Sequence, residues 1–163
     1  MKLPYRGVAI GAVVLAFSAV LLSRAQAGGG HFYPPVADPL VKEECGSCHL
    51  AFSPAMLPAR SWGRMMDGLQ DHFGDDASVD AASAARIRSY LVANAADAGG
   101  APYSRKLARD LPAWQAPLRI TELPAWRREH RDVPAWEWKH KDVRTQANCL
   151  ACHTAAERGY YED

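Results

Sequence analysis

The sequence has no marked surplus of charge of either sign, because 19 Lys and Arg stand against 18 Asp and Glu in its 163 residues. Three of the basic residues, Lys2, Arg6 and Arg24, lie in the first 27 residues, so the rest of the chain carries a formal charge of −2. Proteins that bind nucleic acids concentrate positive charge on one surface. The composition therefore argues against nucleic acid as a partner.

Long apolar segments are also scarce. The one long run, Val8 to Leu22, is shorter than the roughly 20 apolar residues that a membrane-spanning helix needs. Lys2 and Arg6 precede it and Ala25-Gln26-Ala27 follows it, which is the order of a secretory signal peptide and its cleavage site. We therefore predict cleavage near Ala27 and a soluble protein in a bacterial periplasm. A retained N-terminal anchor is the alternative.

Cysteine is rare, and all four cysteines fall in two copies of one pattern. The copies are Cys45-Gly46-Ser47-Cys48-His49 and Cys149-Leu150-Ala151-Cys152-His153. Two thiols three residues apart on one turn can each form a thioether with one of the two vinyl groups of a haem, while the adjoining histidine binds the iron. The motifs predict two covalently bound c-type haems, with His49 and His153 as the proximal iron ligands.

Other chemistries for these cysteines explain fewer of the residues. A disulfide within one motif would close a strained small ring and would leave both histidines without a role. A structural zinc site needs ligands from cysteine pairs brought together, and it does not require histidine at the same offset in both copies. A thioredoxin-like dithiol expects one motif in a βαβ context, and no strand pattern occurs in the sequence.

Helical spacing of apolar residues predicts a mainly α fold with irregular connections. The helices expected in the first half are Pro39–His49 with Asp38 as N-cap, Ser61–Phe73 with Ser61 as cap, and Ala81–Ala96 with Asp80 as cap. Trp62, Leu69 and Phe73 would form the apolar face of the second of these helices. A last short helix is expected from Val143 into the second haem motif.

The second half contains many prolines and a repeated Pro-Ala-Trp unit at 112–114, 124–126 and 134–136. We expect each proline to start a turn or short helix and each tryptophan to be an apolar anchor; the alternative is that the tryptophans wall the second haem. Gly99-Gly100-Ala101-Pro102 precedes this region and marks a predicted boundary. The expected organisation is a leader (1–27), a first haem module (28–98) and a second haem module (99–163).

Each haem iron has a second axial position, and for the first haem His72 is the favoured ligand. His72 ends the predicted 61–73 helix in the same module as the first motif. Met65 lies seven residues earlier, on nearly the same helical face, and it is the rival, with Met66 beside it. A methionine ligand would raise the reduction potential, whereas a second imidazole would lower it. An open site is the remaining alternative.

For the second haem a histidine is expected, because no methionine lies in the C-terminal half. His130 is favoured over His140, since Lys139 and Lys141 flank His140 and indicate a solvent-exposed position. His31 lies close to the predicted mature N-terminus and is the weakest candidate.

Several stretches together resemble the periplasmic diheme cytochrome c family. They are residues 38–49, 57–62, 71–74, 119–122, 128–130 and 147–153. The likeness covers roughly Tyr33 to Gly159. It implies a class I cytochrome c-like N-terminal haem module followed by a small irregular C-terminal haem module. It also implies bis-histidine, low-potential haems in which His72 and His130 match the family's ligands.

The predicted ligation indicates function. Two histidines close both faces of an iron, so such haems suit electron transfer and resist oxygen or peroxide chemistry. We therefore predict a monomeric electron carrier and not an enzyme, with its two haems close together. The alternatives are a diheme peroxidase or reductase, or a gas-binding haem protein, each with one open iron site. The resemblance implies a membrane b-type cytochrome and a small soluble haem protein as partners, with at most peripheral membrane contact.

Overall fold

Short helices make up nearly all the regular structure in the computed structural model, which describes residues 31–99 and 102–162. The α-helices found there are α2 (Pro39–Gly46), α3 (Ala59–Met66), α4 (Ala81–Ala93), α5 (Pro102–Ala108) and α6 (Pro124–Glu129). The 3₁₀ helices are η1 (Pro54–Met56), η2 (Leu69–Asp71), η3 (Ile120–Glu122), η4 (Glu137–Lys139), η5 (Cys149–Ala151) and η6 (Ala156–Arg158). No strand forms in the described ranges, where only isolated β-bridges occur. The expected mainly α fold is therefore confirmed.

The predicted signal peptide and its cleavage site lie outside the described residues, as do Gly100 and Ala101 of the predicted module boundary. The described residues belong to one compact unit that begins at His31. A division of this unit into two haem modules stays a prediction. Within the described ranges, no helix is both long enough and apolar enough to cross a membrane.

Helix α2 begins where the sequence predicts. The Asp38 carboxylate accepts hydrogen bonds from the amides of Leu40 and Val41, and Pro39 occupies the first helical position. The helix ends at Gly46, within the first haem motif, and not at His49 as expected. The Ser47 hydroxyl donates to the Glu44 carbonyl, which satisfies one of the last carbonyl groups of the helix.

Helix α3 differs from its prediction at both ends. It starts at Ala59 after Pro58, so Ser61 lies inside the helix, fully buried, and does not cap it. It stops at Met66, because the chain turns at Gly68, whose amide donates to the Met65 carbonyl. The predicted 61–73 helix is thus a shorter helix followed by η2.

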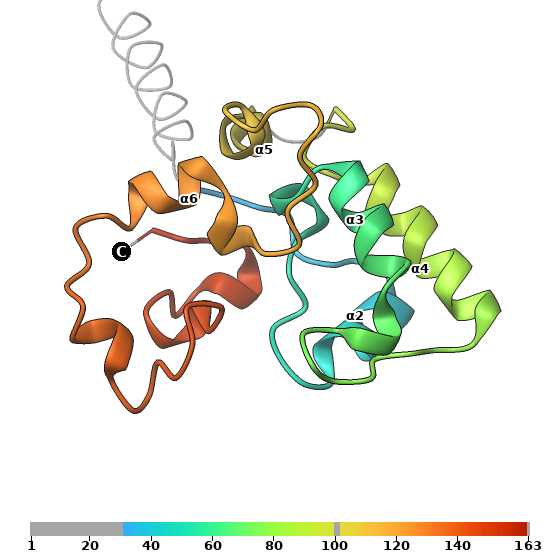
Figure 1. The fold of residues 1–163 in the computed structure, drawn as a ribbon, viewed down its shortest axis with the longest axis horizontal. Coiled ribbons are helices and arrows are strands. Elements are labelled where there is room, and N and C mark those ends of the chain that lie inside the picture. Colours follow the sequence, from blue (N-terminus) through green and yellow to red (C-terminus); the bar gives the residue numbers. More distant parts are fainter. Residues whose placement is uncertain (1–30, 100–101, 163) are drawn as a thin grey trace, which may run out of the picture. The chain divides into compact units, whose positions relative to one another are not determined.

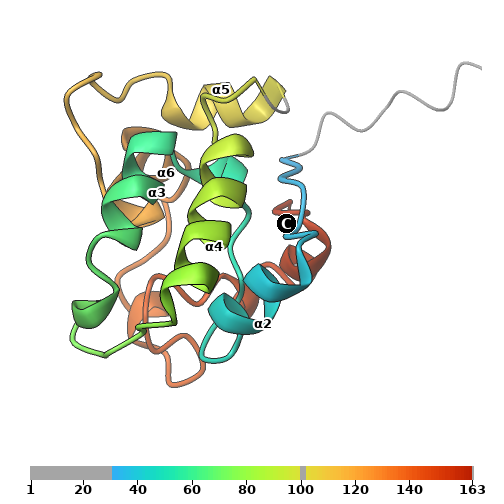
Figure 2. The same ribbon diagram turned by 90° about the vertical axis from the view of Figure 1, so that its right-hand side faces the viewer.

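Helices α3 and α4 lie side by side and contribute much of the core (Figures 1 and 2). Asp80 caps α4 as predicted, and its carboxylate accepts from the amides of Ala82 and Ser83. Ile87 and Leu91 of α4 are buried. The helix ends at Ala93, short of the predicted Ala96. The buried hydrophobic cluster also includes Val41, Leu57, Trp62, Leu107, Leu111 and Leu123.

The second half of the chain is attached to the first by two arginines of α3. Arg60 Nε donates to the Gln115 carbonyl at 2.6 Å, and Arg64 Nη1 donates to the Ala116 carbonyl at 3.1 Å. These residues stand four apart, hence on one face of α3. Both therefore hold the same extended segment, which leads into η3.

The helix expected from Val143 into the second motif is wrong, since only the 3₁₀ helix η5 forms there. Asn148 is the physical reason. Its amide nitrogen Nδ2 donates to the carbonyls of Asp142 and Val143, at 3.1 and 3.2 Å. Such side-chain bonds to the backbone compete with helix formation. Arg144 also has a positive φ of 61°, which no α-helix contains.

The three Pro-Ala-Trp units behave differently from one another. Pro124 starts α6, and its Trp126 is partly buried against the core. Pro112 and Pro134 start turns as predicted, but Trp114 and Trp136 are 81% and 65% exposed. The expectation that every tryptophan anchors the core is therefore wrong for these two.

Candidate functional site

All four cysteines of the two motifs are free thiols, so the disulfide alternative is not found. Cys45 and Cys149 are partly buried, whereas Cys48 and Cys152 are exposed. No group of three or more His, Cys, Asp or Glu side chains is arranged to hold a metal ion in the described ranges. The structure thus offers no geometry there for the structural zinc interpretation.

The first motif brings His49 opposite His72. The two ring centroids lie 6.1 Å apart, and the ring planes are 22° from parallel. His49 follows the end of α2, and its Nδ1 donates to the Leu50 carbonyl at 2.8 Å. Because a carbonyl can only accept, this bond puts the ring proton on Nδ1 and leaves Nε2 available to bind a metal.

The second motif brings His153 opposite His130 at the end of α6. Here too the ring centroids lie 6.1 Å apart, but the planes stand at 84°. His130 Nδ1 donates to the Trp126 carbonyl at 2.8 Å, which leaves Nε2 available to bind a metal. The Trp126 ring stacks on His130 at 4.2 Å, and Trp138 lies 6.1 Å from the same imidazole. Among the three repeated tryptophans, Trp126 is thus the one that contacts this histidine pair, which agrees with the alternative interpretation for that residue.

The spacing of both histidine pairs fits an iron between them. A metal-bound imidazole nitrogen lies about 2.0 Å from the metal and about 1.1 Å from its own ring centroid, so two such rings on opposite faces have centroids about 6 Å apart. Both pairs match this value. In each pair one histidine directly follows two cysteines, as covalent haem attachment requires. The residues present therefore fit a haem at each motif.

The methionine rivals of His72 lie on a different element from it. Met65 and Met66 end α3 and pack against the hydrophobic core, whereas His72 follows η2. The prediction that Met65 and His72 share one helical face is thus wrong. Met65 and His72 do line the same hollow, of about 260 Å³, together with Phe73 and Leu118.

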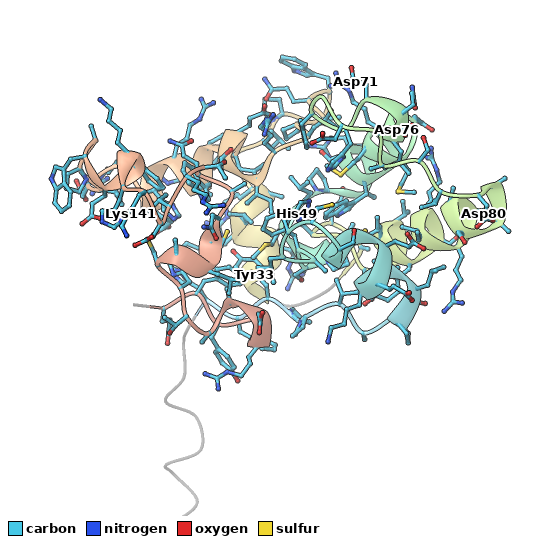
Figure 3. All side chains as sticks on the ribbon, turned by 90° about the horizontal axis from the view of Figure 1, so that it is seen from below. Tyr33, His49, Asp71, Asp76, Asp80 and Lys141 are labelled. Carbon is cyan, nitrogen blue, oxygen red and sulfur yellow. The ribbon has the colours of Figure 1, made fainter. Side chains whose placement is uncertain are left out.

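His140, the alternative ligand to His130, lies beside a carboxylate and not opposite a motif histidine. His140 is half exposed, and its Nδ1 lies 3.6 Å from the Asp142 carboxylate. In Figure 3 the neighbouring Lys141 lies to the left of the labelled His49. Of the two candidates, the structure pairs His130 with His153. The carbonyl of His31, the weakest candidate, accepts from the amide of Tyr161.

Electrostatics at the first site favour a neutral imidazole. Burial lowers the pKa of His72 below its usual value, and the neighbouring charges of His49 and Arg119 lower it further, while Asp75 opposes them. Neutral imidazole is the form that binds a metal. Burial also raises the pKa of the Cys45 and Cys149 thiols, that of Cys149 to about 11.

Sequence reasoning missed three residues beside the paired histidines. Arg119 Cζ lies 3.8 Å above the centroid of the Phe73 ring, next to His72. The Tyr161 ring lies 5.6 Å from that of His153, and it meets Tyr33 edge-on. Trp138 lies outside the Pro-Ala-Trp repeat. The contacts of Arg119 with Phe73 and of Tyr161 with Tyr33 join distant parts of the sequence, so no local spacing could have indicated them. Trp138 and Tyr161 each lie eight residues from the histidine they contact, and no helical spacing links them to it.

Comparison with known proteins agrees with this geometry. Residues 41–161 match a family model described as dihaem cytochrome c. A solved diheme cytochrome c from Rhodobacter sphaeroides is 48% identical with a TM-score of 0.71, over 78% of this chain and 98% of that chain. The diheme cytochrome sb-DHC from Shewanella baltica is 33% identical with a TM-score of 0.62, over 76% of this chain and 86% of that chain. A comparison with curated proteins finds no match.

Proposed function

The chain belongs to the dihaem cytochrome c family, and from that premise we propose that it is a soluble periplasmic carrier of single electrons. The family carries two covalently bound c-type haems and transfers electrons. The proposal adds that both haems are six-coordinate and of low potential. The observation that carries it is the equal 6.1 Å spacing of the two histidine pairs.

The proposed ligand sets follow from the paired rings. His49 and His72 would bind the first iron, and His153 and His130 the second, with Cys45, Cys48, Cys149 and Cys152 as the thioether residues. When bound, each haem supplies a one-electron redox couple. The Leu50 and Trp126 carbonyls orient one imidazole in each pair and increase its basicity, which would favour the ferric state of a bound haem.

Closed coordination supports a carrier over an enzyme. Peroxidase, reductase and gas-binding chemistry all need an iron with an open position. A centroid spacing of about 6 Å is the spacing expected for an imidazole on each face of one iron, and such an iron would have no open position. Two imidazoles also give a lower reduction potential than a histidine–methionine pair.

The distribution of charge supports two different partners. Residues 31–99 contain nine acidic and five basic residues, whereas residues 102–162 contain eight acidic and eleven basic residues. The first range is therefore net negative and the second net positive. Net charges of opposite sign on two parts of a protein attract different partners. We propose that a membrane b-type cytochrome and a small soluble haem protein use the two sites, and that the carrier is a monomer with at most peripheral membrane contact.

Mass spectrometry and optical spectra of the exported protein test the proposal. We expect a mass increase of two haems on a chain that begins after Ala27, recovered from the periplasmic fraction. The ferric and ferrous spectra should both be low-spin and should not change when carbon monoxide is added. A bare polypeptide would contradict haem attachment, whereas high-spin signals or rapid carbon monoxide binding would favour a peroxidase, a reductase or a gas-binding protein.

A further inference from the structure

Arg119, from the second half of the chain, reaches the first histidine pair. Its guanidinium carbon lies 3.8 Å above the Phe73 ring centroid, which is the distance of a cation–π contact. The Phe73 ring in turn lies 4.7 Å from the His72 ring. Arg119 therefore contacts the neighbour of the proposed sixth ligand.

The position of Arg119 is fixed by the hydrogen bonds through which α3 holds the second half of the chain. Arg60 and Arg64 of α3 hold the carbonyls of Gln115 and Ala116, a few residues before Arg119. Leu118, which lies between Ala116 and Arg119 in the sequence, lines the hollow beside His72. These hydrogen bonds thus hold the residues just before η3 beside the first site.

The turn that carries His72 depends on packing for its conformation. Phe73 has a φ of 59°, a left-handed value that costs a non-glycine residue free energy. Two backbone hydrogen bonds between His72 and Asp75 close the turn. The Phe73 side chain is 44% exposed, and Arg119 covers one face of its ring.

The His72 imidazole is held less directly than its counterparts. The rings of His49 and His130 each donate to a backbone carbonyl, whereas no hydrogen bond to the His72 ring is found within the described part of the chain. Its orientation therefore depends on neighbouring rings, of which Phe73 is the nearer at 4.7 Å.

The carboxylate next to Arg119 is that of Glu122, whose Oε2 accepts from the Arg119 backbone amide at 3.4 Å and does not pair with its guanidinium. In the described ranges, no carboxylate lies within 4.0 Å of this guanidinium to form an ion pair. A positive charge beside a redox centre favours the state that has gained an electron.

We propose that Arg119 is a positioning residue for the first haem: it holds His72 through Phe73, and its charge raises the reduction potential of that haem alone. The inference rests on the proposed function, because it takes His72 as an axial ligand. It gives the two haems different potentials by a cation–π contact that, among the described residues, the first site has and the second lacks. A residue of the second half of the chain would thus set the reduction potential of the haem that is attached to the first half.

The test measures both reduction potentials and carbon monoxide binding in the haem-loaded protein. Arg119→Gln removes the charge, Arg119→Lys keeps it, Phe73→Leu removes the ring, and Arg109→Gln is a control at an exposed arginine. The first haem is identified as the one whose potential His72→Met raises. Arg119→Gln should shift the equilibrium of that haem roughly threefold to tenfold toward the oxidised state, where tenfold equals about 59 mV for one electron.

Further outcomes separate the two effects of Arg119. Arg119→Lys should restore most of the potential, while Phe73→Leu should increase carbon monoxide binding at the first haem with a smaller shift in potential. Arg109→Gln should change neither quantity. Equal shifts of both haems in Arg119→Gln, or no shift and no added carbon monoxide binding, would overturn the inference. Wild-type protein without two low-spin haems would instead overturn the proposed function, so the two failures are distinguishable.

Discussion

His49 and His72 face each other with ring planes only 22° from parallel, whereas His130 and His153, at the same 6.1 Å spacing, stand at 84°. This difference has an electronic consequence for low-spin ferric iron. Parallel imidazoles interact with the same iron d orbital and separate it in energy from its partner. Perpendicular imidazoles interact with one orbital each and leave the two nearly equal in energy, which preserves more orbital angular momentum.

Electron paramagnetic resonance should therefore show two different low-spin ferric signals. The first haem should give a rhombic spectrum with a moderate spread of g values, and the second should give a signal with one much larger g value. His72→Met should replace the rhombic signal and leave the other in place. Two superimposable signals in the wild-type protein would show that the ring orientations do not differ as they do here.

Substitution of His130 and His140 decides the ligand of the second haem. Because His130 lies opposite His153 and His140 lies beside Asp142, we expect His130→Ala to open one iron of the two. One haem per protein should become high-spin and bind carbon monoxide, as measured by optical titration. His140→Ala is the matched control and should keep both haems low-spin. The reverse result would make His140 the ligand.

Much of the fold and site could be predicted from the sequence where the signal is local. Asp38 and Asp80 cap their helices through bonds to amides two and three residues ahead, so their role is visible in the sequence. The two haem motifs are local for the same reason. The sequence and the family resemblance predict His72 and His130 as partners, and the structure places each opposite a motif histidine.

The remaining errors arise where distant residues decide local structure. Helical periodicity in the sequence continues through Phe73, but α3 ends at Met66 and the chain turns at Gly68. His72 therefore lies outside the helix, where its ring faces that of His49. Asn148 closes a turn with Asp142 and Val143 where a helix was expected. The contact of Arg119 with Phe73 spans two halves of the chain, and sequence spacing carries no information about it.

Trp62 offers a test of the core that supports the first site. Its indole Nε1 donates to the buried Pro54 carbonyl at 2.8 Å, and its side chain is almost fully buried. Trp62→Phe removes the donor and leaves that carbonyl without this partner, so we expect a loss of about 1–3 kcal/mol in the free energy of unfolding. Denaturant unfolding followed by circular dichroism measures it. Trp114→Phe, at an exposed position, is the control and should change stability little.

The ion pair of Arg86 with Asp38 predicts how stability depends on pH. The hydrogen bond from the Arg86 side chain is the largest cause that holds the pKa of Asp38 below its usual value of 3.8. A carboxyl with a lowered pKa stabilises the folded state above pH 3.8, and this contribution is lost as the pH falls through the folded pKa. Arg86→Gln should therefore reduce stability near neutral pH, with a difference from wild type that disappears in strong acid.

Denaturant midpoints across the acid range measure this difference, and comparison with the wild type cancels the titration of groups that both proteins share. The pair is partly exposed, so added salt should weaken the effect. Asp38→Asn supplies the matched control, since asparagine can still cap α2 but cannot form the ion pair. In that background Arg86→Gln should have no further effect. A difference between Arg86→Gln and wild type that stayed constant down to strong acid would assign the effect to packing and not to the charge of Asp38.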